Sequence, residues 1–441
     1  MPLIRDFSLA RGLATRALRS RRQRRRLDAM GAERQAREPE PGTVRVAVYF
    51  ADSAVNMYQI RQWYGPLAHL ARTVPVAIVS RSPGAMLTLL EESPVPVVYA
   101  RRVTDLEAFV EAQPLALTLY VNQNAKNFQM MRYGRMWHVF VNHGESDKMY
   151  MTTNQFKAYD YAFVAGDAAR ARLEAKLWDY DLDKRAVPIG RPQTDHLDGT
   201  PPFVPDDRTV VLYAPTWEGD RSSAAYGSIA SHGTALARAV LASPRHRLIY
   251  RPHPRSGVVD RDYRRAHQEI VAAIAAADPA AGHLHDAGGE LGWQLAVADV
   301  AVTDISAMVY DRLATGKPLL VTRPTSPDAD VDEQGYLGAA GWLTADDASA
   351  VVEVVDRLLA DPDAAGRLDH WVQRHFGDTT PGAATARFEA AVGRLVALRD
   401  EYAARDEASA APAPRPSSRP GDAEARRRSL VVDDDGDDGL D

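Results

Sequence analysis

Short β-forming runs alternate with helical patterns from residue 43 onward, and this alternation limits the chain to a few folds. The runs are typical of buried parallel strands. A turn-rich segment without periodicity, DGTPPFVPDD at 198–207, interrupts the pattern, which then starts again. The predicted strands are 43–50, 74–80, 95–100, 115–122, 137–144, 161–166 and 186–190 before this joint, and 210–214, 247–251, 299–304 and 318–322 after it. The sequence therefore predicts an α/β fold of two Rossmann-like domains facing a cleft, with ligands beyond the carboxyl ends of the strands.

Helical patterns fill the intervals between the predicted strands. They cover 54–72, 168–177, 234–242, 261–277, 290–298 and 305–315, and residues 345–403 are mostly helical. A chain of 441 residues also exceeds the roughly 250–300 residues at which a single core stops growing. We expect a basic N-terminal arm at 1–40, an N-terminal Rossmann-like domain at 41–200, a C-terminal Rossmann-like domain at 201–403, and a disordered acidic tail at 404–441.

Composition excludes several kinds of protein. The chain has no cysteine, so disulfides, thiolate metal sites and cysteine nucleophiles are ruled out. No apolar stretch approaches the roughly 20 residues that span a bilayer, and the N-terminus lacks the apolar core of a secretion signal. We therefore expect a cytoplasmic protein.

Residues 1–26 are strongly basic, with nine arginines against the single acid Asp6. Apolar residues recur there at helical spacing, namely Leu3, Phe7, Ala10, Ala14, Ala17 and Leu18. Such a helix could lie on an anionic membrane surface, which would place the protein peripherally on the inner face of the cell membrane. A solvated arm explains the same residues equally well. Nucleic-acid binding is not predicted, because the rest of the chain is not basic and no aromatic residues interleave with the arginines.

His143 and Gly144 stand at the end of the predicted strand 137–144. A histidine at the carboxyl edge of the first sheet would face the second domain, where it could act as a general base toward an acceptor hydroxyl. Gly144 permits close backbone approach to a ligand. A lone histidine is more often structural than catalytic, so this assignment depends on its combination with residues of the second domain.

The second predicted sheet offers polar residues at the corresponding edge. Asp304 and Ser306 follow strand 299–304 at a helix N-terminus, whose unpaired amide groups favour a pyrophosphate, although helix capping would select the same residues. Arg251 and His253 follow strand 247–251 and supply a fixed cation and a titratable donor. Thr216 follows strand 210–214. Together they favour a pyrophosphate site over capping alone.

Several well-known motifs are missing. The sequence contains no G-x-G-x-x-G after the first strand, no P-loop, no H-E-x-x-H and no G-x-S-x-G, which argues against nicotinamide dehydrogenases, P-loop enzymes, zincins and α/β-hydrolases. No cofactor and no metal site are predicted.

Six motifs in order resemble the CDP-glycerol glycerophosphotransferase family, whose members build teichoic acids. They are HG at 143–144, GRPQTDHL at 190–197, YAPTWEGD at 213–220, RPHP at 251–254, TDISAMVYD at 303–311 and HFGDTTPGAATARF at 375–388. Two departures from the family pattern occur: the stretch GESDK, with Glu145 to Lys148, follows His143, and Ala307 stands where a second serine is common.

The resemblance implies a glycosyltransferase-B type fold, with the acceptor bound by the domain at 41–200 and the nucleotide donor by the domain at 201–403. It also implies transfer of a polyol phosphate from a CDP-alcohol donor to a hydroxyl of a lipid-linked or polymer acceptor, with release of CMP. By position, His143 resembles the family's proposed base and His253 the histidine that contacts donor phosphate. The residues that fall in the family's donor site are Gly144, Thr216, Arg251, Asp304 and Ser306.

Two other functions fit the same sequence. A nucleotide-sugar glycosyltransferase or an epimerase of UDP sugars shares the double Rossmann plan and could use the same pyrophosphate site. A non-enzymatic protein of the membrane surface could bind a nucleotide or a glycan and recruit partners through its charged ends.

Overall fold

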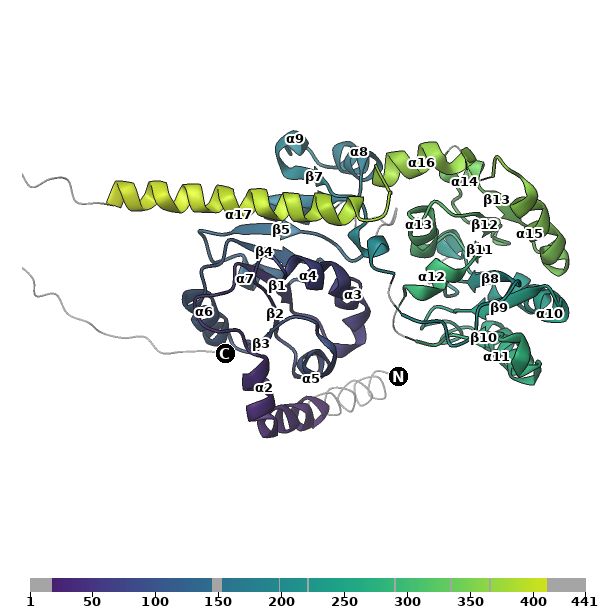
Figure 1. Ribbon diagram of the computed structural model, residues 1–441, viewed down its shortest axis with the longest axis horizontal. Coiled ribbons are helices and arrows are strands. Elements are labelled where there is room, and N and C mark those ends of the chain that lie inside the picture. Colours follow the sequence, from purple (N-terminus) through teal and green to yellow (C-terminus); the bar gives the residue numbers. More distant parts are fainter. Residues whose placement is uncertain are drawn as a thin grey trace, which may run out of the picture. The chain divides into compact units, whose positions relative to one another are not determined.

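The computed structural model describes residues 18–144, 153–197, 199–219, 222–288, 291–333, 335–364 and 366–410. Two parallel β-sheets, each with helices on both faces, make up most of this part of the chain (Figure 1). Both sheets lie within residues 1–399, which form one compact unit. No described helix combines the length and the apolar character needed to cross a membrane.

The first sheet has the strand order β3-β2-β1-β4-β5-β6-β7. This order reverses direction between β1 and β4, the kind of switch point where doubly wound sheets bind ligands. All neighbouring pairs are parallel, and Val46 of β1 aligns with Val76 on one side and Leu117 on the other. The strands are β1 (Val46–Phe50), β2 (Val76–Ser80), β3 (Val97–Tyr99), β4 (Leu117–Tyr120), β5 (Trp137–Phe140), β6 (Tyr161–Val164) and β7 (Ala186–Pro188).

The second sheet repeats the plan with the order β10-β9-β8-β11-β12-β13, again fully parallel, and its switch point lies between β8 and β11. Its strands are β8 (Thr209–Ala214), β9 (His246–Tyr250), β10 (Leu284–His285), β11 (Val300–Thr303), β12 (Leu319–Thr322) and β13 (Gly341–Leu343). Two Rossmann-like sheets in series are therefore present, as the alternation in the sequence predicts.

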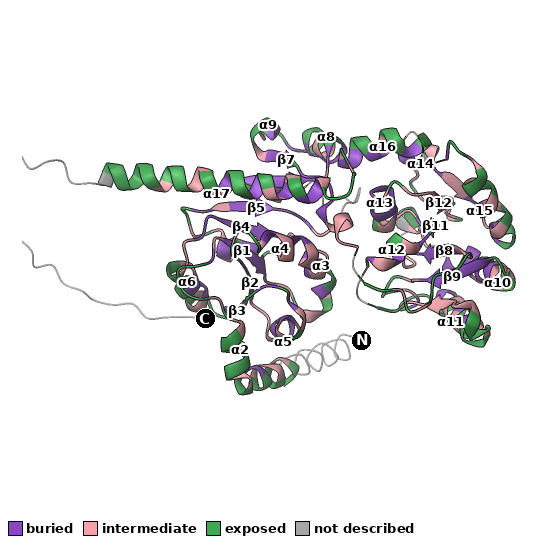
Figure 2. Ribbon diagram, in the orientation of Figure 1, coloured by how far each residue is buried: buried purple, intermediate pink, exposed green. Residues whose placement is uncertain are grey.

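Each central strand is buried on both faces (Figure 2). Because successive side chains of a strand point to opposite faces, Val46 and Val48 of β1 enter one apolar core and Ala47 and Tyr49 enter another. This explains why the strands read as continuous apolar runs rather than as alternating ones.

Helices pack on both faces of the sheets. They are α2 (Gly31–Arg37), α3 (Met57–Arg61), α4 (Tyr64–Leu70), α5 (Pro83–Glu92), α6 (Val103–Ala112), α7 (Asn127–Met130), α8 (Asp167–Lys176), α9 (Leu182–Arg185), α10 (Thr234–Ala242), α11 (Arg261–Ala276), α12 (Trp293–Val297), α13 (Ala307–Leu313), α14 (Tyr336–Ala339), α15 (Val351–Ala360), α16 (Gly366–Phe376) and α17 (Ala383–Ala410). Residues 18–29 are also helical, and within them Leu27 is fully buried.

The single helix predicted at 54–72 is divided into a 3₁₀ turn, α3 and α4. Pro66 causes the main break, because proline is tolerated only in the first turn of a helix, and it sits in the first turn of α4. Trp63 lies between the two helices and is buried, so the interruption also brings an indole ring into the core.

Helix α17 packs on the first sheet, although the sequence analysis placed residues up to 403 with the second domain. Phe388, Val392 and Leu395 are buried in the same core as Val46 and Val48 of β1. The indole of Trp137 in β5 donates a hydrogen bond to the carbonyl of Leu395 at 3.1 Å, and Figure 1 shows α17 running along β5. The periodicity of 383–399 gave no indication of which sheet the helix would cover.

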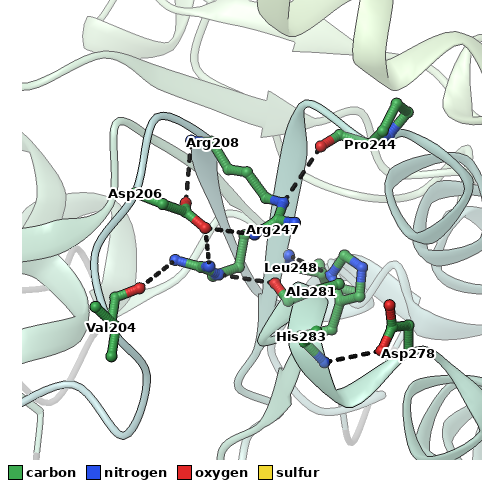
Figure 3. A network of polar contacts seen from close by, with 10 residues as sticks. Val204, Asp206, Arg208, Pro244, Arg247, Leu248, Asp278, Ala281 and His283 are labelled. Atoms are coloured by element: carbon green, nitrogen blue, oxygen red, sulfur yellow. Dashed lines mark hydrogen bonds and ion pairs between the residues drawn. The ribbon is translucent and has the colours of Figure 1, made fainter.

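The joint at 198–207 is fastened to the second sheet by Arg247 of β9 (Figure 3). The guanidinium of this buried arginine pairs with the Asp206 carboxylate at 2.7 Å, donates to the carbonyl of Ala281 at 3.0 Å and lies 4.2 Å from the centre of the Phe203 ring. Because Arg247 stands near the amino end of β9, this network lies away from the edge where ligands are expected, and its role is to hold the joint.

Candidate active site

The turn that carries His143 is held in an uncommon backbone conformation. β5 ends at Phe140, and Asn142 then adopts a φ of +54°, a left-handed value that asparagine tolerates better than most residues. The Trp63 indole donates a hydrogen bond of 2.5 Å to the Asn142 carbonyl, and the Asn142 amide donates to the carbonyl of Gly144. The strand therefore stops abruptly and presents His143 at its carboxyl end.

The ring of His143 is oriented by a neighbouring strand end. Its Nδ1 lies 2.9 Å from the carbonyl oxygen of Val121, the residue after β4, and the Tyr58 ring meets it edge-on at 5.8 Å. A carbonyl only accepts hydrogen bonds, so Nδ1 carries the proton of the neutral ring and Nε2 carries the lone pair. His143 thus has the tautomer in which Nε2 can accept a proton.

A hydrogen-bonded cluster of polar side chains lies at the switch point of the first sheet. Asn122, which follows β4 and is buried, donates to the Gln59 side chain at 2.7 Å and to the Asp52 carboxylate at 3.3 Å. Asp52 follows β1, so the two strands on either side of the switch point are joined by side chains at their carboxyl ends.

Thr216 and Asp304 meet across the switch point of the second sheet. The carboxylate oxygen Oδ2 of Asp304 accepts hydrogen bonds from the backbone N–H groups of Thr216 at 2.7 Å and Ser228 at 3.1 Å, while Oδ1 accepts one from the Thr322 hydroxyl at 2.6 Å. Burial raises the pKa of Asp304 to about 6, against the lowering effect of these donors.

Asp304 is entirely buried, which changes the role that we expect for it. A carboxylate with both oxygens bound to protein donors, and no exposed surface, holds other groups in place. The geometry therefore favours Asp304 as a positioning residue for the loop at Thr216, where the sequence analysis had expected a group that contacts the donor.

Ser306 is the N-cap of α13, and its hydroxyl accepts a hydrogen bond from the backbone N–H of Met308 at 3.3 Å. The helix is shorter than the predicted 305–315. The capping role considered for Ser306 is present, and its contact with a pyrophosphate stays a prediction.

Arg251 does not stand alone at the end of β9. Its guanidinium pairs with Asp286 at 2.5 Å, and the same carboxylate accepts a hydrogen bond from the Gln294 amide at 2.6 Å. The side chain is 14% exposed, so its charge is shared with a carboxylate and only its edge reaches the surface. Burial raises the pKa of Asp311, and the positive charges of Arg191 and then Arg251 offset only part of that rise.

The loop that carries His253 is fastened to the loop after β8 by Glu218. The carboxylate of Glu218 accepts hydrogen bonds from the backbone N–H groups of Gly257 at 3.0 Å, Val259 at 2.9 Å and Asp260 at 3.1 Å. Partial burial raises the pKa of Glu218, but these N–H groups outweigh it and hold the pKa below its ordinary value. Gly257 has a φ of +73°, and a Cβ there would lie 2.8 Å from the Cα of Arg264.

The ring of His253 is oriented in the opposite sense to that of His143. Its Nδ1 accepts a hydrogen bond of 3.1 Å from the backbone N–H of Arg255, so in the neutral ring Nε2 carries the proton and is a donor. The guanidinium of Arg255 lies 4.0 Å from the centre of the Trp217 ring, and the backbone N–H of His253 donates to the Pro215 carbonyl at 3.1 Å. His253 itself is exposed.

Replacement of Glu218 by glutamine should loosen the His253 loop. Glutamine keeps one acceptor oxygen and replaces the other by an amide that cannot accept, so at least one backbone N–H loses its partner, at a cost of about 1–2 kcal/mol. We expect a lower thermal unfolding temperature and a Michaelis constant for the nucleotide donor raised several-fold. Glu353→Gln, on the exposed face of α15, is the matched control. Equal donor binding in the two variants would contradict this role.

A buried ion pair joins the two halves of the candidate site. Arg191, three residues after β7, binds Asp311 of α13, and both side chains are only 7% exposed. The same terminal nitrogen of Arg191 also donates a hydrogen bond of 3.3 Å to the side-chain oxygen of Gln62. Both charged residues lie inside motifs quoted above, but neither was singled out, because the sequence does not show that they meet.

All of the predicted site residues lie in the described part of the chain, and some of them are in contact. Thr216 meets Asp304, and the hydrogen bonds described for His143 and for His253 each lie within one half of the site. The approach of the two histidines to each other stays a prediction. Glu145 to Lys148 lie outside the described residues, and no cluster of three potential metal ligands occurs among the described ones.

Solved structures with the same fold include proteins of two kinds. The wall teichoic acid polymerase TagF, as a histidine-to-asparagine variant with CDPG, has a TM-score of 0.53 and 12% identity over 87% of this chain and 98% of its own. A putative UDP-N-acetylglucosamine 2-epimerase from Listeria monocytogenes has a TM-score of 0.52 and 15% identity over 80% and 96%. The S. aureus MnaA–UDP structure has a TM-score of 0.51 and 13% identity over 78% and 94%.

These likenesses and the two parallel sheets confirm the predicted glycosyltransferase-B type fold. Residues 116–330 match the family model described as CDP-Glycerol:Poly(glycerophosphate) glycerophosphotransferase, so the resemblance predicted from the motifs is confirmed. The match to this family model over residues 116–330 favours a glycerophosphotransferase-type transferase, and the solved structures show the fold. No curated protein sequence matches the chain.

Proposed function

We propose that this protein transfers a glycerol phosphate, or another polyol phosphate, from a CDP-activated donor to an acceptor hydroxyl and releases CMP, in the synthesis of teichoic acid or a related polymer of the cell envelope. His143 is the general base and His253 is the donor to phosphate. The acceptor, lipid-linked or polymeric, binds to the half that contains the first sheet, and the nucleotide binds to the half that contains the second.

The opposite hydrogen bonding of the two histidine rings carries this proposal. The Val121 carbonyl at Nδ1 of His143 leaves a lone pair on Nε2, and the Arg255 N–H at Nδ1 of His253 leaves a proton on Nε2. A transfer to a hydroxyl needs one group that takes a proton and another that stabilises developing negative charge. Backbone contacts thus prepare each ring for one of these two tasks.

The proposed step moves one proton and exchanges one bond. The acceptor hydroxyl gives its proton to Nε2 of His143 while its oxygen attacks the β-phosphorus of the donor. The bond between this phosphorus and the bridging oxygen breaks, and CMP leaves with the bonding electrons. Nε2–H of His253 donates a hydrogen bond to the phosphate oxygens, on which negative charge accumulates.

The remaining residues of the proposed donor site would contact the diphosphate or hold the loop beside it. The edge of Arg251 and the hydroxyl of Ser306 contact the diphosphate, and the loop at Thr216 closes against it while Asp304 holds that loop from below. Gly144 leaves room beside the base. The histidines approach each other when donor and acceptor are both bound.

Donor specificity tests the proposal. The purified full chain is incubated with CDP-glycerol, CDP-ribitol, UDP-N-acetylglucosamine and UDP-glucose, each with and without a glycerol phosphate acceptor, and the released nucleotides are separated. CMP release that depends on the acceptor is expected. Release of UDP alone, or interconversion of UDP sugars without release, would assign the site to a glycosyltransferase or an epimerase instead. Binding of CDP-glycerol with no turnover under any condition would favour the non-enzymatic alternative.

The basic arm is proposed to hold the protein on the inner face of the cell membrane. Arg21, Arg22 and Arg25 are exposed on the helix formed by residues 18–29. Each basic residue near an anionic surface contributes about 1 kcal/mol, so replacing all three by glutamine should weaken binding to phosphatidylglycerol vesicles roughly 100-fold. Turnover on a water-soluble acceptor should not change. Replacement of Arg261, Arg265 and Arg238 in the second half gives a control of equal charge, and equal loss of vesicle binding in both triple variants would refute the assignment to the arm.

A further inference from the structure

Four hydrogen-bonded side chains extend from the switch point of the first sheet to the ring of His143. Asp52 and Asn122 each stand two residues after a strand, and these strands, β1 and β4, are parallel neighbours. Tyr58 and Gln59 both belong to α3. The ring of Tyr58 meets that of His143 edge-on. The network therefore lies beside the proposed base, at the edge of the sheet where ligands are expected.

The direction of each hydrogen bond in this network is fixed by partners that can play only one role. The side-chain oxygen of Asn122 accepts a hydrogen bond of 3.3 Å from the backbone N–H of Asn124, which can only donate. The amide nitrogen of Asn122 therefore donates to the Asp52 carboxylate at 3.3 Å and to the Gln59 oxygen at 2.7 Å. Because the oxygen of Gln59 is on this side, its amide nitrogen faces Tyr58 and donates to the hydroxyl at 3.3 Å.

The two ends of the network consequently differ in what they offer to a ligand. The Tyr58 oxygen accepts from Gln59, so its O–H is a donor directed away from the network, and the residue is 45% exposed. At the other end, each oxygen of Asp52 accepts one hydrogen bond, from Asn122 or from the backbone N–H of Ser53. A carboxylate can accept about four, and Asp52 is only half-buried.

A donor at one end and an acceptor at the other suit an alcohol. A hydroxyl group can accept a hydrogen bond from Tyr58 and donate one to Asp52. A phosphate oxygen can only accept, and the negative charge of Asp52 would repel it. The amides of Asn122 and Gln59 are buried and hold both ends in place. Their aligned hydrogen bonds polarise one another, which strengthens the terminal donor.

We propose that Tyr58 and Asp52 bind the acceptor hydroxyl next to the one that is attacked, so that the site selects a polyol with two neighbouring hydroxyls over a simple alcohol. The proposal rests on the proposed function and specifies one part of it, the recognition of the acceptor. His143 takes the proton of the attacked hydroxyl while the neighbouring hydroxyl is held by the network. An acceptor without that second hydroxyl leaves polar groups of the site unpaired and is rejected.

The alternative is that the network only fastens the end of β1 to the end of β4. Tyr58→Phe separates the two roles, since it removes the terminal donor but keeps the ring against His143 and both hydrogen bonds of the Asn122 amide nitrogen. Asp52→Asn removes the charge and one acceptor oxygen at the other end. The matched controls are Tyr402→Phe, 51% exposed on α17, and Asp369→Asn, exposed on α16.

The kinetic test compares glycerol 3-phosphate with 3-hydroxypropyl phosphate as acceptors for CDP-glycerol. The two compounds differ only in the hydroxyl beside the primary one. We expect the wild type to prefer glycerol 3-phosphate at least tenfold in kcat/KM. This preference should fall about tenfold in Tyr58→Phe and Asp52→Asn, through a loss with glycerol 3-phosphate alone, and stay unchanged in the two controls. A merely structural role would lower turnover of both acceptors equally.

The same two head groups carried by a lipid in vesicles form a second arm of the kinetic test. A preference that depends on Tyr58 and Asp52 in either arm supports the proposal and identifies the natural source of the acceptor. A preference that both variants retain, or an equal loss with both acceptors, overturns it, provided that the variants unfold near the wild-type temperature.

A binding measurement decides the proposal even without turnover. Titration calorimetry should give the wild type and both controls a dissociation constant for glycerol 3-phosphate about tenfold below that for 3-hydroxypropyl phosphate, and Tyr58→Phe and Asp52→Asn similar constants for the two. Equal affinities of the wild type, or no binding of either compound in solution or on vesicles, would reject the assignment. Because CMP release is measured separately, failure of this proposal and failure of the proposed function give different results.

Discussion

Replacement of His143 by alanine is expected to lower kcat for polyol-phosphate transfer about 10²–10⁴-fold, the usual contribution of a positioned general base. The Nδ1 contact with the Val121 carbonyl fixes the tautomer in which Nε2 carries the lone pair that the proposed base uses. The Michaelis constant for the donor should change little, since His143 belongs to the half that contains the first sheet. Steady-state kinetics with CDP-glycerol and a phosphate-bearing acceptor measure both quantities.

Two further variants sharpen this prediction. His143→Asn retains an N–H donor for the Val121 carbonyl but has no basic nitrogen, so it should be as inactive as the alanine variant while unfolding near the wild-type temperature. His370→Ala removes an exposed histidine of α16 and should retain full activity. If His143→Asn kept most of the turnover, His143 would be a structural residue and the base would have to be sought elsewhere.

Replacement of Asp304 by alanine is expected to destabilise the protein by about 2–4 kcal/mol and to raise the donor Michaelis constant about tenfold. The backbone N–H groups of Thr216 and Ser228 would lose their shared acceptor beneath the surface, at about 1–3 kcal/mol for each unsatisfied group. The loop after β8 would then no longer be held against the end of β11. Thermal unfolding and donor kinetics report the two effects separately.

Asp304→Asn is the informative companion variant. Both backbone donors bind the same oxygen, Oδ2, so an asparagine oxygen can accept both while its amide faces the Thr322 hydroxyl. We expect stability within about 1 kcal/mol of the wild type at neutral pH. Asp299→Ala, which removes an acceptor for the backbone N–H of Val210 at the opposite edge of the sheet, should lower stability without affecting the donor Michaelis constant. Loss of donor binding in Asp299→Ala as well would indicate general loosening rather than a specific role for Asp304.

Because the pKa of Asp304 is raised, the stability of the wild type and that of Asp304→Asn should depend differently on pH. The pKa in the folded protein, about 6, lies above the ordinary value of 3.8, so folding favours the protonated form. The stabilising contribution is therefore complete below about pH 4 and is lost as the pH rises through 6, by about 3 kcal/mol in total. Urea unfolding between pH 4 and 7.5 should show this decline in the wild type and not in Asp304→Asn, and parallel curves for the two proteins would contradict the raised pKa.

The strands could be predicted from sequence because they are buried on both faces, so VVLYA at 210–214 reads as an apolar run whatever surrounds it. β10 and β13, of two and three residues, are too short for any periodicity. The assignment of α17 to the second half failed for a different reason: an amphipathic helix indicates that a face is buried but not which sheet it covers.

The candidate site, too, could be predicted from the sequence only in part. Residues such as His143 and Thr216 could be found because they follow strands, and the topology of a parallel sheet places them at one edge. Whether a side chain at that edge points outward or inward depends on tertiary contacts, which is why the sequence did not indicate that Asp304 is fully buried. The pairing of Arg191 with Asp311 joins residues 120 positions apart, and no local pattern encodes it.

The return of α17 to the first sheet affects how the chain can acquire its structure during synthesis. Phe388, Val392 and Leu395 complete a core whose other members are made from residue 27 onward, so the ribosome must translate nearly the whole ordered chain before that core can close. Until then, the nascent first half has an uncovered apolar face, the kind of surface on which chaperones act and from which aggregates grow. A gene fragment that ends at the joint would produce a protein in that unfinished condition permanently.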